Sequence, residues 1–402
     1  MAFQWQMRGG VLLDNQRLSN SEPNLAITTP KRWSLILGYS AGHFLVDFSC
    51  AFLMFISIAG SPHWYLCLLL YNFCAFAMQA PLGLIADKLS KNWLFAIAGC
   101  VLVITAYGMC AVSGPGELAL VAVIVLGTGN ALYHLGGGID VLNVSEGRFG
   151  PVGLFVSPGA FGIFFGTLLG TSASLPAFLV VIALIALALL VAAIRRALGK
   201  SYPQNAAFSL AMGTRAKSGS QHAAEAGSNS RSKALSLVLL FAALCFFLVV
   251  FMRSHAGMAL TFSWKSLSYW GLIAVSAVVG GKALGGFLAD RFGVLKVATF
   301  SLSLAAVLYL FSAAPLPGVG AILLFNMTMP ITLCAMVRVF PGAKGFAFGL
   351  LTFALFLGFL PTYLGAVATT SPLFAFWLAV ASLLFLIPAL KLVLDATKKR
   401  ED

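Results

Sequence analysis

The sequence predicts an all-α membrane protein whose twelve transmembrane helices form two pseudo-symmetric six-helix bundles. Three observations predict this fold class: an apolar composition, a series of apolar stretches of membrane-spanning length, and a repeat at one fixed offset. The 402 residues are 60% hydrophobic and only 9% charged, and the mean hydropathy is +0.96. Soluble domains average about 25% charged residues, so the composition indicates a chain that folds in lipid.

The apolar stretches are judged by length, because the hydrocarbon core of a bilayer takes about 20 helical residues to cross. Twelve stretches are long enough, with boundaries soft by several residues: 33–58, 63–87, 92–113, 117–139, 151–173, 176–198, 234–256, 266–290, 294–314, 317–338, 345–367 and 372–394. The division between the fourth and fifth is the least clear, because GGGIDVLNVSEGRFG is only weakly polar. The first 32 residues contain no short apolar core with a cleavage site, so we expect no cleaved signal peptide.

The formal net charge of +13 follows the expected membrane topology. With both termini in the cytoplasm, the cytoplasmic segments hold nearly all Lys and Arg, and the outer loops receive only Lys265. This positive-inside distribution predicts cytoplasmic termini and a multi-pass protein of the plasma or inner membrane. We therefore expect the lipid bilayer, and no nucleic acid, beside the basic residues, and we expect a monomer.

The longest polar segment, 199–233, is rich in Ser, Ala and Gly and has the composition of a flexible linker. It lies between the sixth and seventh apolar stretches and divides the chain into two halves of six. The expected organisation is a cytoplasmic tail, a bundle, a linker, a second bundle and a short tail: 1–32, 33–198, 199–233, 234–395 and 396–402.

The two halves match at an offset of 203 residues, where PLGLIADKLSKN after the second stretch faces ALGGFLADRFGVL after the eighth. The offset pairs five positions: Gly83 and Gly286, Asp87 and Asp290, Lys88 and Arg291, Pro158 and Pro361, Gly162 and Gly365. One shift that aligns two Asp, two basic residues and two mid-span Pro indicates internal duplication of a six-span unit. Many secondary transporters are built in this way.

The repeated loop resembles the signature loop of the major facilitator superfamily, which reads Gly-x-Leu-Ala-Asp-Arg followed by Gly and further basic residues. The second copy, GFLADRFG, is the closer, whereas the first departs from the pattern with Ile85, Lys88 and Ser90. The span count, the linker position and the repeat extend the resemblance over the whole chain. It implies two six-helix bundles around a central cavity, lined mainly by spans 1, 4, 7 and 10, with alternating access.

The resemblance also gives the loop carboxylates a role, because in the family this Asp helps to hold one face closed by pairing with a basic group and a neighbouring helix end. Asp87 and Asp290 inherit that role. A carboxylate is stabilised at a helix N-terminus or beside Arg, and opening requires that contact to break. The alternative is that both are interfacial cap charges. The gating loops are Gly83, Asp87, Lys88, Gly286, Asp290 and Arg291.

Span 5 carries a second, partial resemblance. GLFVSPGAFG places Gly153, Pro158 and Gly162 at the spacing of the family's antiporter-associated motif, Gly-Pro-x-x-Gly-Gly. Ser157 and Phe161 replace two of its glycines. Pro removes a backbone hydrogen bond and small residues allow close packing, so we expect a bend here and at the matching positions of span 11. The motif favours export over import; the alternative is a packing kink. Within the superfamily, GNALYHLGGG (129–138) and MRSHAG (252–257) suggest the fosmidomycin-resistance-like exporters.

Span 1 places an imidazole and a carboxylate among apolar residues. In GYSAGHFLVDFSCAFLMF, residues 38–55, His43 and Asp47 lie four apart and hence on one helical face. Charged side chains inside a membrane span are costly and mark functional sites. We expect Asp47 to carry the coupling proton with His43 as its partner or relay; the alternative is a static pair that orders span 1. The positions 203 residues later are Phe246 and Val250, so only one half has the pair.

Other polar residues lie in spans 4, 7 and 10, which the resemblance places around the cavity, and one lies in span 8. The candidate cavity residues are Asn130, Tyr133 and His134 in span 4, Arg253 in span 7, Lys282 in span 8 and Asn326 in span 10. His134 alone is interpreted as a hydrogen-bonding residue. Arg253 and Lys282 would suit an anionic group, whereas a cationic drug would use Asp47; Lys282 can also pair with a carboxylate or extend to the interface.

The predicted function is secondary active transport of a small organic molecule by alternating access, as proton-coupled efflux of a drug or metabolite. The alternatives are a proton-coupled importer or uniporter of an organic anion or nutrient, a channel, and a non-transporting sensor. The chain has no HExxH and no GxSxG, so we expect no enzyme. The seven Cys lie within the apolar stretches without CxxC or Cys/His spacing, so we expect no metal and no cofactor.

Overall fold

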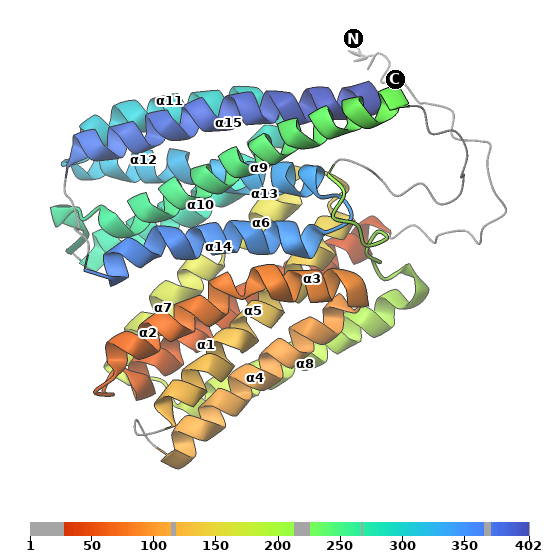
Figure 1. The fold of residues 1–402 in the computed structure, drawn as a ribbon. Helices are drawn as coiled ribbons and strands as arrows, with labels where there is room; N and C mark the ends of the chain where they lie inside the picture. The colour runs from red at the N-terminus through yellow and green to blue at the C-terminus, as the bar shows by residue number, and fades with distance from the viewer. Residues whose placement is uncertain (1–27, 114–117, 213–225, 267, 366–370, 402) are drawn as a thin grey trace, which may run out of the picture.

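The computed structural model describes residues 28–113, 118–212, 226–266, 268–365 and 371–401 (Figure 1). Most of the expected N-terminal tail and the middle of the expected linker, residues 213–225, lie outside these residues, and the last residues of that linker already belong to the helix that begins at Ala226. All the regular elements among the described residues are helices. These helices alternate with short connections, as the sequence predicts.

The first half contains six spans, three of which are interrupted or extended by short turns of another helical type. Its elements are α1 (Thr29–Leu53) with η1 (Met54–Ile58); α2 (Trp64–Asn72), η2 (Phe73–Ala77) and α3 (Gln79–Leu89); α4 (Asn92–Ser113); α5 (Ala119–Val144); α6 (Phe149–Val156) and α7 (Gly159–Ser172); and α8 (Ala177–Leu198) with η3 (Gly199–Ser201). Pro158 separates α6 from α7, because it cannot supply a backbone donor to the helix.

The second half contains six further spans. Its elements are α9 (Ala226–Ala259), η4 (Ser263–Ser266), α10 (Ser268–Phe292), α11 (Val294–Leu310), α12 (Pro315–Asn326), α13 (Thr328–Val339), α14 (Lys344–Tyr363) and α15 (Pro372–Glu401). Span 10 is the union of α12 and α13, which are separated at Met327. The backbone of Met327 lies so close to α10 that a Cβ at Gly285 would be 2.1 Å from its carbonyl oxygen.

Among the described residues, eleven helical segments are long and apolar enough to cross a membrane, and 294–310 forms a shorter apolar helix. Together they make the twelve spans that the sequence predicts, with ends that differ by a few residues. The weakly polar stretch between the fourth and fifth spans contains the true boundary, because α5 ends at Val144 and α6 begins at Phe149. The chain is therefore a multi-pass helical membrane protein.

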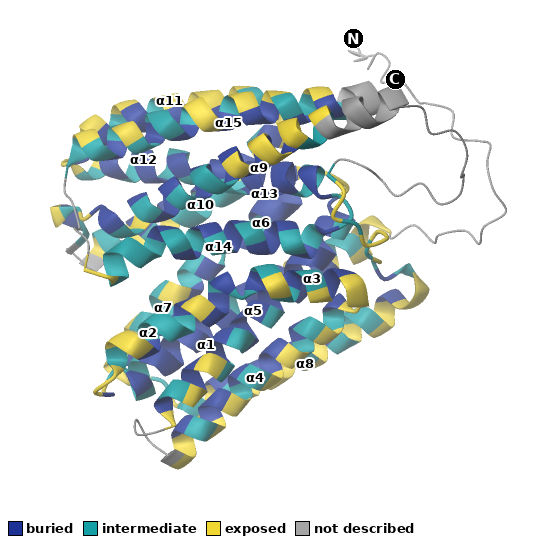
Figure 2. Ribbon diagram, viewed as in Figure 1, coloured by how far each residue is buried: buried dark blue, intermediate teal, exposed yellow. Residues whose placement is uncertain are grey.

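The helices of the two halves lie in two groups, with most of α1–α8 in the lower part of Figure 1 and α9–α15 in the upper part, and α6 reaches in among the helices of the second half. In the most apolar stretch of spans 1, 4 and 10, 67% of residues are buried, against 22% in span 6. Figure 2 shows exposed residues along the outward faces of α4, α8 and α11. Spans 1, 4 and 10 are thus central, whereas span 6 presents most of its surface to lipid.

The beginning of the expected linker is packed against the protein, which differs from the flexible segment that its composition predicts. The Tyr202 side chain is 4% exposed, and its hydroxyl donates to the carboxylate of Asp140. Asn205 donates to the backbone oxygen of Ala86 at 3.3 Å. The backbone N–H of Ser209 then donates to the carbonyl of Gly342, in the second half, at 3.1 Å. We call residues 199–212 the strap, because they connect the two bundles at one end.

Asp140 explains why the strap is held. This residue is fully buried in α5. Its carboxylate accepts hydrogen bonds from Tyr39 at 2.9 Å and from Asn92 at 2.8 Å, in addition to that from Tyr202. A buried carboxylate is costly without such donors, so the hydroxyl of Tyr202 meets a need that composition alone does not reveal.

Candidate functional site

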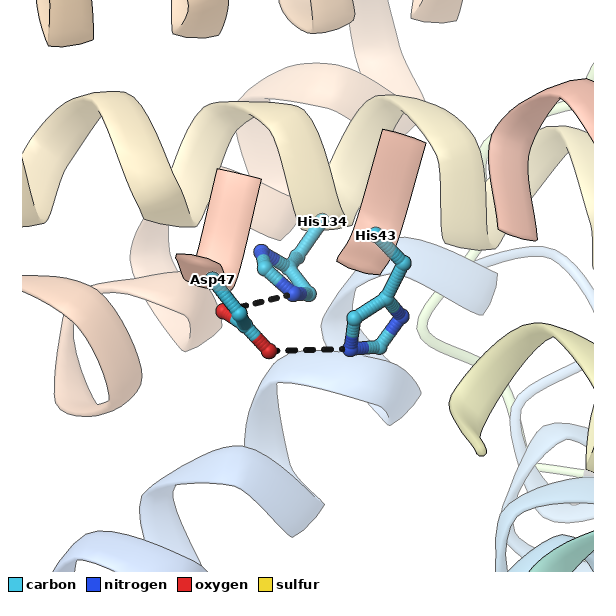
Figure 3. Close-up of side chains that lie close together, drawn as sticks. All are labelled: His43, Asp47 and His134. Atoms are coloured by element: carbon cyan, nitrogen blue, oxygen red, sulfur yellow. Dashed lines mark ion pairs between the residues drawn. The ribbon is translucent and has the colours of Figure 1, made fainter. Parts of the chain in front are cut away.

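Two imidazoles and one carboxylate meet at the centre of the first bundle (Figure 3). His43 and Asp47 lie on α1 and His134 lies on α5, and each of these residues is at most 8% exposed. His43 Nε2 lies 3.3 Å from Asp47 Oδ2, and His134 Nε2 lies 3.4 Å from Asp47 Oδ1. The two imidazole rings meet edge to face with their centroids 4.2 Å apart. We call His43, Asp47 and His134 the acid–histidine cluster.

Asn130 anchors the cluster one helical turn before His134. Its side-chain amide donates to Asp47 Oδ1 at 2.9 Å, and its backbone carbonyl lies 2.8 Å from His134 Nδ1. A carbonyl oxygen can only accept, so Nδ1 of His134 carries a hydrogen. The contact between His134 Nε2 and the carboxylate is then attractive only if Nε2 is protonated as well, or if a cation lies between them. The geometry therefore provides a place for one additional proton.

His43 differs from His134 in its second ring nitrogen. Nδ1 of His43 is buried and has no hydrogen-bond partner among the described residues. When His43 is neutral and donates its Nε2 hydrogen to Asp47, the hydrogen bond of Nε2 is satisfied. The lone pair of Nδ1 then has no hydrogen-bond donor. Such an unsatisfied buried nitrogen is costly, and a water molecule that donates to Nδ1 would relieve it.

The same three side chains have the donor set of a small metal site. Their ligand atoms all lie within 4.8 Å of one another, and all three residues are buried. Two imidazoles and one carboxylate would suit a divalent transition metal with an open fourth position. The sequence predicts no metal here, and the nearby cationic side chains described next would oppose a second positive ion.

A cavity of about 300 Å³ lies between the two bundles and contacts the acid–histidine cluster. From the first half it is lined by residues of spans 1, 2, 4 and 5, and from the second half by residues of spans 7, 8, 10 and 11. Arg253, Lys282 and Asn326 line it opposite the cluster. The structure thus brings His43, Asp47, His134, Arg253, Lys282 and Asn326 together around one space.

Two of the candidate cavity residues lie beside this space. Asn130 does not line the cavity; it donates to Asp47 and is 1% exposed. Tyr133 is fully buried, and its hydroxyl donates to the backbone oxygen of Tyr39 at 3.3 Å. Adjacent residues on an α-helix differ by about 100° in direction, so Tyr133 and His134 cannot face the same space. Both are expected at the cavity from the sequence, and only His134 lines it.

Arg253 reaches the break in span 10. Its guanidinium approaches Thr328 Oγ1 at 3.4 Å and Met329 Sδ at 2.8 Å, and the residue is 5% exposed. Both partners are neutral, and a thioether is a weak acceptor. The sequence analysis misses the neighbouring Gln79, which also lines the cavity and lies 203 residues before Lys282.

The two repeated loop carboxylates each cap a helix of the opposite half. Asp87 accepts from the backbone N–H groups of Gly345 and Phe346, at 2.8 and 2.9 Å, where α14 begins. Asp290 accepts from the N–H groups of Phe149 and Gly150, both at 2.8 Å, where α6 begins. A helix N-terminus favours a carboxylate because its N–H groups are otherwise unpaired. We call these two contacts the latches and their end of the molecule the latch face.

The glycines of the gating loops allow these contacts. A Cβ at Gly83 would lie 2.3 Å from the carbonyl oxygen of Gly345, and one at Gly286 would lie 2.5 Å from that of Phe149. The basic residues of the loops face away from the carboxylates: Lys88 lies over the ring of Phe208 at 5.2 Å, and Arg291 over the ring of Phe292 at 5.5 Å. The helix ends, rather than these basic groups, partner the two Asp.

The latches also correct the register of the repeat in spans 5 and 11. Asp87 and Asp290 are 203 residues apart, but the helix starts that they cap, Phe149 and Gly345, are 196 apart. Pro158 breaks span 5 between α6 and α7, whereas Pro361 lies in the last turn of α14. Gly365 follows that helix with φ of 77°. Pro361 and Gly365 are therefore not the counterparts of Pro158 and Gly162, and they form no mid-span bend.

Gly153 and Gly162 lie in the tight contacts of span 5. A Cβ at Gly153 would be 2.6 Å from the backbone oxygen of Lys282, and one at Gly162 would be 2.3 Å from that of Phe44. Span 5 thus touches the second bundle through α6 and the helix of the acid–histidine cluster through α7. The Pro158 break lies between these two contacts.

No model of a known protein family matches the chain, and no curated protein is similar to it in sequence. Solved structures are nevertheless similar. FucP, a major facilitator superfamily transporter in the outward conformation, matches with a TM-score of 0.60 at 15% identity, over 89% of this chain and 97% of its own. A variant of the E. coli fucose:proton symporter FucP matches at 0.52 and 15%, over 89% and 95%. The proton:xylose symporter XylE, bound to 6-bromo-6-deoxy-D-glucose, matches at 0.53 and 13%, over 89% and 96%.

These likenesses extend over nearly the whole chain, so the protein has the major facilitator fold, which confirms the fold that the sequence predicts. At 13–15% identity they show the fold alone. The fosmidomycin-resistance-like subgroup stays a prediction.

Proposed function

We propose that the protein is a proton-coupled secondary active transporter that moves a small organic molecule across the plasma membrane by alternating access. One observation carries the proposal: a protonatable cluster forms part of the wall of a cavity between two bundles that are latched together at one face. The fold supports it, because many secondary transporters place substrate and coupling-ion sites at the interface of two repeats.

The proposed cycle follows from the contacts at the two ends. While both latches hold, the latch face is closed and the cavity exchanges with the other side only. Breaking the bonds of Asp87 and Asp290 to the opposite half lets the bundles separate at the latch face. Because Asp47 and the two imidazoles line the cavity, they are then exposed to the other aqueous phase. A proton that enters on one side can thus leave on the other, with Asp47 as the coupling carboxylate and His43 and His134 as its partners.

Reconstitution tests this proposal. Purified full-length protein in liposomes that contain a pH-sensitive dye should show saturable proton movement when members of a panel of anionic, neutral and cationic small molecules are added. Asp47→Asn should abolish movement driven by a gradient while exchange of substrate across the membrane continues. Asp395→Asn, at the far end of α15, removes a carboxylate outside the cavity and serves as the matched control. Proton movement without saturation would indicate a channel, and its absence with every compound would indicate a sensor.

The direction of transport has two candidates. Export in exchange for protons is favoured by the partial antiporter-associated motif around Pro158. Uptake together with protons is favoured by the kind of structures that are similar, since FucP and XylE are proton symporters. Liposomes with opposite pH gradients distinguish them: an inward proton gradient drives the substrate out in the first case and in with the protons in the second.

A further inference from the structure

The cavity wall that belongs to the second half carries two cationic side chains. Arg253 on α9 and Lys282 on α10 both line it. None of the ion pairs in the described part of the chain includes either residue. Arg253 has only neutral contacts, to Thr328 and Met329. Positive charge in a membrane interior is costly unless it is paired, so two such side chains require an account.

The second half of the chain cannot supply the missing negative charge. Residues 226–394 contain one carboxylate, Asp290, and the N-terminus of α6 holds it at the latch face. Asp47 is the acidic residue in the cavity lining, and its two oxygens are already in contact with Asn130, His43 and His134. The cavity therefore has more cationic than anionic groups even when both imidazoles are neutral.

The rest of the wall is suited to the organic part of a molecule. Phe76 and Phe359 meet edge to face with centroids 5.2 Å apart, one from each bundle, and Phe348 and Leu355 complete an apolar side. The volume of about 300 Å³ lies at the small end of the range for ligand sites, about 300–1,000 Å³. The space suits a compact molecule with an apolar body.

A second cavity, of about 380 Å³, continues from the first and extends the cationic surface away from the latch face. It shares Arg253, Gly257 and Asn326 with the central cavity and is also lined by Lys265 of η4. Lys265 is the one basic residue that the predicted topology places in an outer loop. Lys282, Arg253 and Lys265 thus follow one another along a continuous space.

We propose that the substrate is a small organic anion, a carboxylate, phosphate or phosphonate, whose charged group binds Arg253 and Lys282 while its apolar body lies against Phe76 and Phe359. This inference rests on the proposed function, because it names the substrate class of the same cavity. The planar guanidinium can donate two parallel hydrogen bonds to such a group and the ammonium supplies a further donor. The anion supplies the counter-charge that the second half lacks.

The assignment also gives each wall of the cavity a different ligand to bind. The proton binds the acid–histidine cluster in the first half, and the anion binds the basic pair in the second half. Because the two sites line one small cavity, each charge stabilises the other across it. A cationic substrate would instead compete with the proton at Asp47 and would be repelled by Arg253 and Lys282.

Binding measurements on the purified full-length protein test the assignment without a gradient. The probes are matched sets on one ring: benzoate and phenylphosphonate as anions, benzamide as the neutral member and benzylammonium as the cation, extended to larger rings and side chains. The readout is the shift of the thermal unfolding midpoint with ligand concentration, which gives an apparent affinity. We expect anionic members to stabilise the protein, and Arg253→Gln and Lys282→Gln to weaken the best of them by about tenfold or more.

Two kinds of variant keep this test decisive. Arg253→Lys and Lys282→Arg keep the charge and should retain much of the binding, which a loss of folding would not allow. Lys296→Gln, on the exposed face of α11, removes a positive charge far from the cavity and should leave the affinity unchanged. Stabilisation by cationic or neutral members alone, by no anion, or by anions that still bind when both basic residues are replaced would each overturn the assignment.

This measurement separates the two proposals. Anion binding that needs Arg253 and Lys282 in a protein that moves no protons would leave the anion site standing and refute coupled transport. Saturable proton movement with a neutral or cationic molecule would do the reverse.

Discussion

The two halves of the molecule share a scaffold and differ in the charges that they carry toward the centre. Each half ends its second span in an Asp that caps the start of the fifth span of the other half. Each latch is approached by a glycine, Gly83 or Gly286, with no room for a side chain. At the cavity, however, the first half has one acid and two imidazoles, whereas the second has Arg253 and Lys282.

One pair of positions shows the difference directly. Gln79 and Lys282 are equivalent in the scaffold, because a Cβ at Gly349 would meet the backbone oxygen of Gln79 and one at Gly153 would meet that of Lys282. The same place in the two bundles thus holds a neutral amide in one and a cation in the other. The duplicated positions thus hold the latch face together, and in the proposed function the positions that differ between the halves select the substrate.

The largest expected effect comes from breaking both latches together. Asp87→Asn with Asp290→Asn removes charge-assisted hydrogen bonds worth about 1.5–3 kcal/mol each. The two losses together, about 3–6 kcal/mol, should lower the population of the closed latch face by roughly a hundredfold to ten-thousandfold. The buried Cys334, beside the backbone of Arg148 at this face, is a native reporter in a variant that keeps it as its only cysteine. Maleimide should label it much faster after the double replacement.

The two single replacements sharpen the comparison of the latches. Asp87 is 3% exposed, whereas Asp290 is an exposed residue. Water screens the exposed contact more, so Asp87→Asn should increase labelling of Cys334 more than Asp290→Asn does. Equal effects would mean that burial does not distinguish the two latches.

A second, smaller effect is expected from the glycines beneath the latches. Gly83→Ala and Gly286→Ala each force a Cβ against a backbone carbonyl of the other half, at 2.3 and 2.5 Å. Overpacking of this kind costs about 1–3 kcal/mol. Both variants should label faster at Cys334 and transport more slowly, while Gly280→Ala on α10, where the added Cβ meets nothing within 4 Å, should behave like the wild type. A wild-type result for Gly83→Ala and Gly286→Ala would show that the bundles do not approach this closely.

The exchange of the scaffold-equivalent residues breaks the charge asymmetry. Lys282→Gln alone should weaken anion binding by about tenfold, since one charge-assisted hydrogen bond is lost. Adding Gln79→Lys returns a positive charge to the same cavity from the opposite wall and should restore part of that affinity. The measurement is the thermal shift with the best anionic probe. Full loss in the double variant would show that the position of the charge, and not its sign alone, decides binding.

The smallest effect is expected at the strap. Tyr202→Phe removes one of the donors to Asp140 and should destabilise the strap by about 1 kcal/mol, so that proteases cut within 199–212 severalfold faster. Burial, with the negative charge of Asp140 beside it, raises the pKa of the Tyr202 hydroxyl above its usual value. The bond therefore contributes fully below pH about 10 and is lost only above the raised pKa. Cleavage of the Tyr202→Phe variant at the wild-type rate would contradict this.

Much of the architecture is readable in the sequence because lipid imposes simple rules. Apolar length fixes the twelve spans to within a few residues, and the loop motif identifies both latch carboxylates. His43 and Asp47 are identifiable because a charge in an apolar helix is rare. The helix ends that Asp87 and Asp290 cap cannot be identified in the same way, because backbone N–H groups correspond to no pattern in a sequence.

The register of the repeat is misjudged for a physical reason. The second half is seven residues shorter between its latch Asp and the start of its fifth span, as the offsets of 203 and 196 show. Seven residues make nearly two helical turns, so a wrong register still places residues on the same helical face. The two prolines then align by coincidence. Only the contacts of Gly345 and Phe149 reveal the shift.

The strap lowers the binding energy that the latches must supply to close the latch face. Because residues 199–212 are attached to the first bundle at Asp140 and to the second at Gly342, the two bundles meet at this end as parts of one short-tethered system. A tether of this length keeps the effective concentration of one bundle near the other at about the millimolar level. Closing then needs little binding energy of its own, and in the proposed transport cycle the latches can be weak enough to open each time.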